Sequence, residues 1–559
     1  MDFFWGSFVT IVSRLTSGSF ARLTLEATLR KTENDSQMKK KRNAIASAAI
    51  FVSIVGIAKA DPLLSSWYIE KSGSYARIYD SLEDMNSGTV SKTWTSQGQG
   101  SQELPAYAGV QEIAHSTDWV YIKTTGLGTH VMGPWFFDEA KTQDFGNRPA
   151  NTASLYRFPR EVTIPTTKTL TTPGSIGYFV DGIAMFDSTD TFSYDSSAGM
   201  DQTPVNSAQG DDVWVRDAFI NEGVTFDNAN AHHAGSVHHY HANPPALRHA
   251  LGDSVDYDPA TNVYTENFNG NHSPIIGWVR DGLPIYGPYG YSDPDPASND
   301  SGIRRMISGF QLRDGSNGST NLAETGRKSL PKWVNTVEGR SVTLAATEYG
   351  PDVNAEIEGE TYILGRYFED YAYKGDLGLS LGAEFDLNVY NVRFCRTPEF
   401  PEGTWAYFTC ILPDGTPTFP YNIARSYFAD PIGEGLTEIT EEVEVSFEGG
   451  PAKTELIERI QADGDDIVIS WSAVEGGSYR IDSTENLVDW DVSGSTFVAD
   501  RDAFQSTDEG VLASLPERFY RLSRTGLANY DDTEFGSAAG MGPGGGGMGP
   551  PPGGGPPPR

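Results

Sequence analysis

An eleven-residue segment occurs twice in the chain and decides the expected fold: IGYFVDGIAMF at 176–186 and IGWVRDGLPIY at 276–286. The two copies align without gaps at an offset of 100 residues, and four positions are identical. Each copy has an Asp-Gly pair between two apolar runs, which predicts a β-hairpin because glycine accepts the positive φ of a tight turn. The repeat therefore predicts a duplicated, pseudo-symmetric β-domain, in which sites are expected where the two halves meet.

Short strand-like runs continue through most of the chain, separated by Gly-Pro, Asp-Gly and Pro-rich turns. This spacing favours a mainly β fold, with a central β-rich, sandwich-like domain over residues 115–432 and a small β-sandwich over 437–525. A polar lead-in is expected at 61–114. Residues 526–559 are rich in Gly and Pro and cannot bury much apolar surface, so we expect this tail to be disordered.

The N-terminal region has the pattern of a secretory signal peptide over residues 38–60. A basic cluster at 39–42 precedes an apolar run at 44–57, and small residues end the segment. Met38 directly precedes the basic cluster, so we interpret it as the start and residues 1–37 as a mis-called upstream extension. The protein is then expected to be secreted, periplasmic or at the cell surface, with no stable membrane anchor after cleavage.

Composition narrows the partners and the kinds of site. The formal net charge is −34, and an acidic surface repels nucleic acid. The chain has only two cysteines, Cys395 and Cys410, which excludes sites built from clustered thiolates. In an oxidising compartment we expect these two to form a disulfide, with two buried thiols as the alternative. Any transition-metal site would have to use His, Asp and Glu.

Seven of the nine histidines fall between His232 and His272. If residues 237–241 form a strand, side chains alternate, so His239 and His241 project from one face while His238 and Tyr240 project from the other. Two imidazoles on one face can bind one ion, and imidazole suits zinc or copper. The other metal-ligand candidates are His233 and His130 first, and then His232, His272, Asp227, Asp181 and Asp281. The alternative is that the histidines are structural.

The segment His238-His239-Tyr240-His241 resembles the Tyr-His-Tyr-His motif of the YHYH family of exported bacterial proteins. Flanking segments at 130–135, 281–291 and 397–408 agree with it, and the likeness spans about residues 115–430. His238 stands in place of the first tyrosine, so the two-histidine face is kept and the two-tyrosine face is altered. The resemblance implies a domain extent and export, and it supplies no mechanism. Residues 437–525 resemble a fibronectin-like module.

Two main functions remain open at this point, and a third possibility is calcium stabilisation through the abundant Asp and Asn, for which no ligand loop is recognisable. The first is an exported protein that holds a divalent transition metal through the histidine cluster, with hydrolytic or redox catalysis if one coordination position is open. The second is a non-enzymatic cell-surface or matrix protein that binds glycans or proteins, for which the aromatic segment 286–291 is a candidate contact. Glu222, on the best short helical candidate at 213–222, is expected to make ordinary surface or capping contacts.

Overall fold

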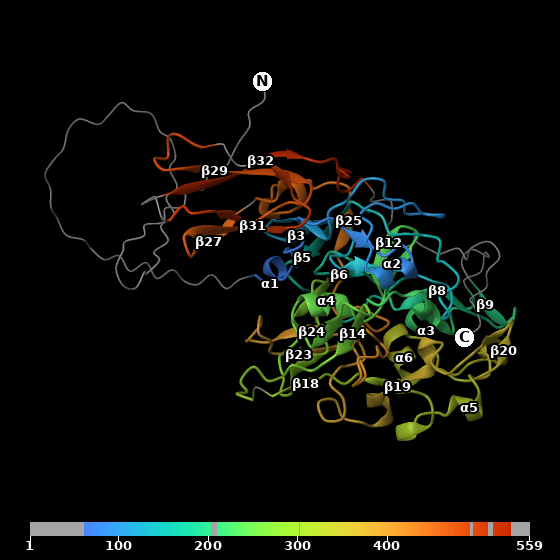
Figure 1. Cartoon of the computed structure of the whole chain (residues 1–559). Coiled ribbons are helices and arrows are strands. Elements are labelled where there is room, and N and C mark those ends of the chain that lie inside the picture. Colours follow the sequence, from blue (N-terminus) through green and yellow to red (C-terminus); the bar gives the residue numbers. More distant parts are fainter. Residues whose placement is uncertain are drawn as a thin grey trace, which may run out of the picture. The chain divides into compact units, whose positions relative to one another are not determined.

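The computed structural model describes residues 61–202, 210–300, 302–454, 456–491, 496–512 and 518–537 (Figure 1). These residues form two compact units. One unit spans Pro62–Lys453 and includes the chain again from Asn529, and the other unit is Thr454–Ala528. The predicted signal peptide and upstream extension lie outside the described residues. Within the described part of the chain, no helix is long and apolar enough to cross a membrane.

The first unit is built on an eight-stranded sheet with two matching halves. From edge to edge, its strands are β11 (Ala231–Ala234), β12 (Val237–Tyr240), β7 (Ala184–Phe186), β6 (Ser175–Phe179), β15 (Ile275–Val279), β16 (Pro284–Tyr286), β24 (Thr404–Phe408) and β23 (Val392–Cys395). The repeated segments are the hairpins β6–β7 and β15–β16, and β6 pairs antiparallel with β15 at the centre. Outward from there, β7 pairs parallel with β12 and β16 parallel with β24, and both edge pairs are antiparallel. The predicted duplication is confirmed; we call the four strands from β11 to β6 the first half and the four from β15 to β23 the second half.

Two glycines allow the halves to approach at the centre of this sheet. A Cβ on Gly177 would lie 2.3 Å from the carbonyl oxygen of Trp278, and a Cβ on Gly277 would lie 2.9 Å from that of Tyr178. Any larger residue at these positions would push the two hairpins apart. The glycine shared by both copies of the repeat is therefore required by the way the copies pair.

A second sheet completes the core of the first unit. Its five strands run in the order β25 (Glu434–Leu436), β5 (Ser154–Pro159), β3 (Trp119–Thr124), β2 (Val110–His115) and β26 (Glu444–Glu448). Apolar side chains from both sheets share one core, including Ile122 and Phe158 from the five-stranded sheet and Phe179, Val279 and Ile285 from the eight-stranded sheet. The mainly β, sandwich-like prediction is confirmed, because apolar residues on facing strands bury each other.

The expected polar lead-in at 61–114 is instead part of the folded unit. Ile78, Trp94 and Ala106 belong to a buried cluster that also contains Met132 and Trp135. The segment's apolar residues are scattered among Ser, Gly and Thr, so composition alone indicates a polar lead-in. Its backbone is held by pairings with distant segments, such as the parallel pairing of β1 (Arg77–Ile78) with β4 (Val131–Met132).

The remaining elements of the first unit are short and connect or cover the two sheets. They are α1 (Pro62–Ser65), α2 (Leu82–Ser87), β8 (Thr189–Asp195), β9 (Met200–Gln202), β10 (Val215–Asp217), α3 (Ala218–Glu222), η2 (Gly223–Thr225), α4 (Pro245–Ala250), β13 (Val255–Asp258), β14 (Val263–Glu266), β17 (Tyr289–Tyr291), β18 (Ile303–Arg305), β19 (Phe310–Leu312), η3 (Ser316–Gly318), α5 (Leu322–Thr325), α6 (Lys332–Glu338), η4 (Ala346–Glu348), β20 (Glu356–Ile357), β21 (Glu360–Thr361), η5 (Phe368–Asp370), β22 (Tyr371–Tyr373), η6 (Lys374–Leu377) and η7 (Gly450–Ala452).

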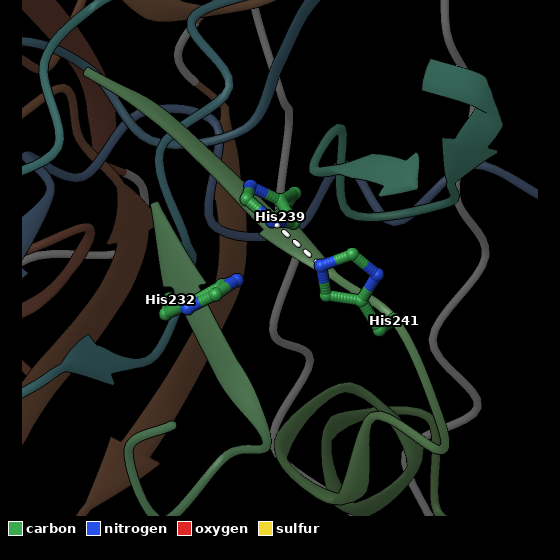
Figure 2. A group of neighbouring side chains, drawn as sticks. All are labelled: His232, His239 and His241. Atoms are coloured by element: carbon green, nitrogen blue, oxygen red, sulfur yellow. Dashed lines mark hydrogen bonds between the residues drawn. The ribbon is translucent and has the colours of Figure 1, made fainter. Parts of the chain in front are cut away.

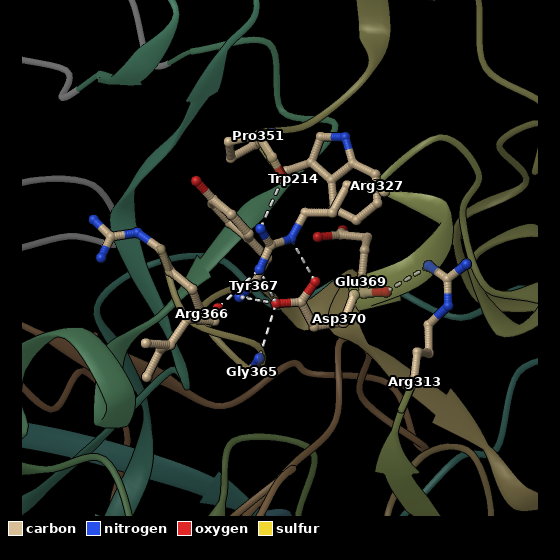
Figure 3. Close-up of polar contacts among 12 residues, drawn as sticks. Trp214, Arg313, Arg327, Pro351, Gly365, Arg366, Tyr367, Glu369 and Asp370 are labelled. Carbon is tan, nitrogen blue, oxygen red and sulfur yellow. Dashed lines mark hydrogen bonds and ion pairs between the residues drawn. The ribbon is translucent and has the colours of Figure 1, made fainter. Parts of the chain in front are cut away.

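A buried charged network lies beside β10, the strand that leads into α3, the helix that carries Glu222. Figure 3 shows its residues. Nε and Nη2 of Arg327 donate to the two carboxylate oxygens of Asp370 at 2.7 and 2.8 Å, and both side chains are fully buried. The adjacent Glu369 accepts a hydrogen bond from the backbone amide of Val215 at 2.8 Å, which ties β10 to the network. Removing one partner of such a buried pair costs about 3 to 5 kcal/mol, so the network holds β10, which ends where α3 begins.

The disulfide expected between Cys395 and Cys410 is wrong, because both cysteines are free and buried. In the β23–β24 ladder Cys395 lies opposite Thr404, the first residue of β24. Cys410 lies beyond Phe408, at the other end of that strand. At about 3.3 Å per residue the two cysteines are separated by roughly 20 Å along the hairpin, far beyond the Cα separation of about 7 Å that a disulfide tolerates.

The second unit, Thr454–Ala528, is a small β-sandwich, but the predicted start at residue 437 is wrong, because β26 (Glu444–Glu448) pairs with β2 in the first unit. One sheet has the order β27 (Ile457–Asp463), β28 (Asp466–Ser472) and β31 (Ala503–Asp508), and the other has the order β30 (Phe497–Val498), β29 (Gly477–Thr484) and β32 (Phe519–Leu527). Trp471 from β28 and Tyr479 from β29 meet in the core between them, with ring centroids 5.2 Å apart. Its fibronectin-like character remains a prediction.

The prediction of a disordered tail at 526–559 is wrong for residues 526–537, which are part of the fold. Strand β32 continues to Leu527, and the chain that follows is bonded to the first unit. The backbone amide of Asp531 donates to the carbonyl of Pro105 at 2.8 Å, and the amide of Gly536 donates to that of Ala153 at 2.7 Å. These backbone bonds explain why composition alone misplaced the boundary. Residues 538–559 lie outside the described part.

Candidate metal centre

The β11–β12 hairpin sets which histidines share a face of the sheet. In its register His232 lies opposite His239, and His233 lies opposite His238. Because residues directly opposite each other in an antiparallel pair project from the same face, His232 joins His239 while His233 joins His238. The turn between the strands has two residues, Gly235 and Ser236, and Gly235 has a φ of 60°.

Three histidines converge on the first of these faces. His232, His239 and His241 each offer one ring nitrogen, and these three atoms lie within 4.8 Å of one another. The Nε2 atoms of His239 and His241 are 3.1 Å apart, and His232 comes from the neighbouring strand (Figure 2). All three side chains are buried. We call this group the triad.

The Nδ1 atoms of the triad fix the tautomers. Nδ1 of His239 bonds the carbonyl of Val237 at 2.9 Å, and Nδ1 of His241 bonds the carbonyl of Asp187 at 2.7 Å. A carbonyl can only accept, so each Nδ1 carries a proton. Nδ1 of His232 lies 2.7 Å from the hydroxyl of Thr225, which donates its own proton to the carbonyl of Glu222, so this nitrogen also donates. The three Nε2 atoms of the neutral rings are therefore lone-pair acceptors.

Glu222, the last residue of α3, brings a fourth acceptor to the same point. Its carboxylate oxygen Oε2 lies 3.4 Å from Nε2 of His232 and 3.3 Å from Nε2 of His241. The Glu222 side chain is 21% exposed, whereas the side chains of these two histidines are at most 5% exposed. Four acceptors this close repel one another unless a cation lies among them, and solvent reaches the group from the Glu222 side.

The electrostatics favour neutral imidazoles at two of the three positions. Burial, together with the neighbouring imidazoles, holds the pKa of His232 and of His239 well below the usual range. For His241, burial alone would lower the pKa, but the hydrogen bond and the charge of Glu222 outweigh it and raise the pKa. A proton on His241 is thus one cation that fits the group, and a metal ion is another that can satisfy all four acceptors together.

Residues 155–421 match the family model described as YHYH protein, and this range contains the triad and Glu222. The chain contains a YHYH domain. No curated protein and no solved structure matches the chain.

Aromatic rings enclose the triad of the YHYH domain. Phe186, at the end of the first repeated hairpin, stacks on His239 with ring centroids 3.7 Å apart and an interplanar angle of 14°. Phe226 lies parallel to His241 at 5.8 Å and meets His232 edge-on at 4.6 Å. These contacts keep the rings in place and limit the access of water, as is usual around a metal centre.

The other predicted ligands lie elsewhere. His233 is held edge-on between Trp135 and Phe145, at 4.7 and 4.9 Å, on the face opposite the triad. His130 and Asp227 belong to a second group with His238. His272 packs against Tyr286 and Tyr291, and its Nδ1 lies 2.7 Å from the carbonyl of Ser273. The expected convergence of His130 and His233 with His239 and His241 is therefore wrong, because the hairpin register places His233 on the other face.

Asp181 and Asp281 occupy the turns of the two repeated hairpins. Each accepts a hydrogen bond from the amide two residues on, from Ile183 at 3.2 Å and from Leu283 at 3.1 Å. This is the usual role of Asp in a turn, and neither residue belongs to the triad.

Two residues of the site were ranked too low from the sequence. His232 was a secondary candidate, although the two-residue Gly235-Ser236 turn is a signal for a tight hairpin that would have placed it opposite His239. Glu222 was expected to make only surface or capping contacts. No local pattern marks it, because its position depends on α3 being anchored by the network around Glu369.

Proposed function

We propose that the YHYH domain binds one divalent transition-metal ion, zinc or copper, through Nε2 of His232, His239 and His241. The observation that carries the proposal is the convergence of three imidazole nitrogens whose other ring nitrogens are all hydrogen-bonded. Metal-bound histidines characteristically donate their second N–H to a carbonyl or another acceptor, which orients the ring and increases its basicity. Three imidazoles with a carboxylate beside them suit zinc and copper alike.

Glu222 is the natural fourth ligand. Its carboxylate already contacts two of the three Nε2 atoms, and its charge balances one of the two positive charges of the ion. If water instead occupies the fourth position, the ion lowers the pKa of that water to about 7, and Glu222 can accept its proton. The first arrangement gives a structural or carrier site, and the second gives a hydrolytic site.

The alternative of a glycan-binding surface has less support. Its candidate platform contains Tyr286 and Tyr289, which are 0% and 5% exposed, so these rings cannot stack on a sugar. Export to the cell exterior is supported by the pattern of residues 38–60 in the sequence, and it is part of the proposal.

The test is metal analysis of the purified full chain, with the double variant H239A/H241A and the control H249A. His249 is an exposed histidine outside both His groups. We expect the wild type and H249A to retain the triad's ion, and H239A/H241A to lose it. Equal metal content in all three proteins would overturn the proposal.

A further inference from the structure

The face of β12 opposite the triad has its own group of buried donor atoms. His130, Asp227 and His238 each offer one ligand atom, and these atoms lie within 4.8 Å of one another. His238 is 1% exposed and Asp227 is 7% exposed. The ring of Tyr240 lies beside them, with its centroid 6.1 Å from His238 and 6.4 Å from His130. The group shares no residue with the triad.

The polar atoms of this group lack partners. Among the described residues, neither ring nitrogen of His130 or His238 has a hydrogen-bond partner, nor has the hydroxyl of Tyr240, and all five atoms are buried. Buried polar groups in folded proteins are nearly always satisfied, so such a concentration needs an explanation. Burial lowers the pKa of His130 to about 4 and that of His238 well below its usual range, so both rings are neutral and have a free lone pair.

In the second half of the sheet the equivalent buried polar atoms are hydrogen-bonded. Tyr240 lies opposite Met185 on β7, and Tyr407 lies opposite the repeat-related Ile285 on β16, so the two tyrosines are equivalent. The hydroxyl of Tyr407 donates to Oδ2 of Asp281 at 2.8 Å.

In the first half the corresponding atoms, the Tyr240 hydroxyl and Oδ2 of Asp181, have no hydrogen-bond partner among the described residues. The position of His238 is taken by Trp405 in the second half, which brings no ligand atom. Of these two equivalent tyrosine–aspartate pairs, only the pair in the half that contains the histidines lacks hydrogen-bond partners.

Asp227 is already oriented for a ligand. Its Oδ1 accepts hydrogen bonds from the amides of Ala229 and Ala231 at 2.9 and 3.1 Å, and its Oδ2 accepts one from Gly133 at 2.8 Å. A carboxylate has about four lone-pair sites, so one remains. The three backbone amides hold the Asp227 carboxylate in one orientation, so binding a ligand would not require it to turn.

We propose that His130, His238 and Asp227 form a second, separate site for a divalent transition-metal ion such as zinc. Two imidazoles and one carboxylate are a sufficient protein donor set for zinc, with the remaining position left to water or to Tyr240. The site depends on His238, which stands where the family motif has a tyrosine. The motif itself therefore does not supply this ligand set.

The test is the zinc content of the full chain after chelator treatment and dialysis against a small excess of zinc. The variant H238Y restores the motif's tyrosine and removes one ligand of the second site while leaving the triad intact. We expect H238Y to bind one zinc ion fewer per chain than the wild type. H130F, which removes the other imidazole, should show the same loss. Equal zinc content in the wild type and both variants would overturn the inference.

The outcomes separate this inference from the proposed function. Two ions in the wild type, with one each in H238Y and H239A/H241A, support both. If the wild type binds a single ion that H238Y and H130F lose and H239A/H241A keeps, the second site stands and the triad proposal fails. If that ion is kept by H238Y and H130F and lost by H239A/H241A, the second site is overturned. Should H238Y fail to fold by circular dichroism, H130F decides.

Discussion

The two halves of the eight-stranded sheet have the same strand order and nearly the same register. They differ in the side chains of the strand that pairs with the repeated hairpin, which is β12 in the first half and β24 in the second. The first half has His238, His239 and Tyr240 where the second half has Trp405, Ala406 and Tyr407. In the second half the buried polar atoms of Tyr407 and Asp281 satisfy each other. In the first half four acceptors converge at the triad, and the opposite face has unpartnered donor and acceptor atoms.

The same backbone arrangement can therefore be stabilised in two ways, by hydrogen bonds between its own side chains or by a bound ligand. In the second half Tyr407 and Asp281 bond each other, whereas in the first half the equivalent Tyr240 and Asp181 atoms have no partner among the described residues and the histidines offer ligand atoms. The first half should therefore respond to metal, and the second half should not.

The largest expected effect is the loss of metal-dependent stability in the first half. At free zinc 100 times the dissociation constant of the triad, binding stabilises the fold by about 2.7 kcal/mol. We expect H239A/H241A to lose this increment, and H249A to keep it. Urea unfolding with and without zinc measures the difference. If zinc raised the unfolding free energy of H239A/H241A as much as that of the wild type, the metal response would not come from the triad.

A smaller effect is expected from Glu222, which reaches the triad from α3. The variant E222Q keeps the shape of the side chain and removes its charge, so the affinity for zinc should fall about tenfold or more, equivalent to about 1.4 kcal/mol or more. Isothermal titration calorimetry with zinc measures this. A matched control is E112Q, because Glu112 lies on β2 and pairs with Lys123 away from the triad. An affinity equal to that of the wild type would show that Glu222 is not a ligand.

The sequence predicted more of the scaffold than of the sites. The repeat at 176–186 and 276–286 was sufficient for the two hairpins, because an Asp-Gly turn between apolar runs has few alternatives. Alternation along residues 237–241 separated His239 from His238 correctly. Ligand sets depend on pairing across the fold, and the sequence pattern does not encode how α3 approaches β12. This is why Glu222 was missed and why His130 was assigned to the wrong face.

The domain limits show a related failure. The segment 61–114 looks polar, and yet Ile78 and Trp94 are buried in a cluster that also contains the distant residues Met132 and Trp135. The disulfide expected between Cys395 and Cys410 failed for the same reason, since their spacing says nothing of the straight hairpin that keeps them apart. Local composition predicts structure poorly where the stabilising contacts are long-range.

The turn carboxylates give a third prediction, which concerns pH. Burial raises the pKa of Asp181 to about 7 and that of Asp281 to about 6, the latter offset in part by bonds from Ala429 and Tyr407. A carboxyl whose pKa is raised in the folded state keeps its proton when the unfolded chain has lost it. Each residue therefore lowers the free energy of unfolding as pH rises from about 4 to the pKa of its carboxyl in the folded state. For Asp181 this range extends about one pH unit further than for Asp281, which corresponds to an additional loss of about 1.4 kcal/mol.

The variant D181N should remove this loss, because an amide does not titrate. Relative to the metal-free wild type, D181N should become more stable as pH increases from 4 to 7, as measured by urea unfolding at several pH values. D281N should flatten the profile only up to about pH 6, and it should be destabilised at every pH because its amide faces the N–H of Ala429. Parallel pH profiles for D181N and the wild type would contradict the assigned shift.

The smallest expected effect comes from removing one hydroxyl from each half. Y407F removes the bond that the hydroxyl donates to Asp281 and the bond that it accepts from the amide of Phe428, so it should cost about 1 kcal/mol or more, the usual net value of a buried hydrogen bond. In the metal-free protein Y240F removes a buried hydroxyl that has no partner among the described residues, so it should be neutral or slightly stabilising. The two variants delete the same atom from equivalent positions, and therefore the difference in their unfolding free energies measures the asymmetry itself. Equal destabilisation by Y240F and Y407F would mean that the first half is as self-sufficient as the second, because Tyr240 would then have a bonded partner in solution.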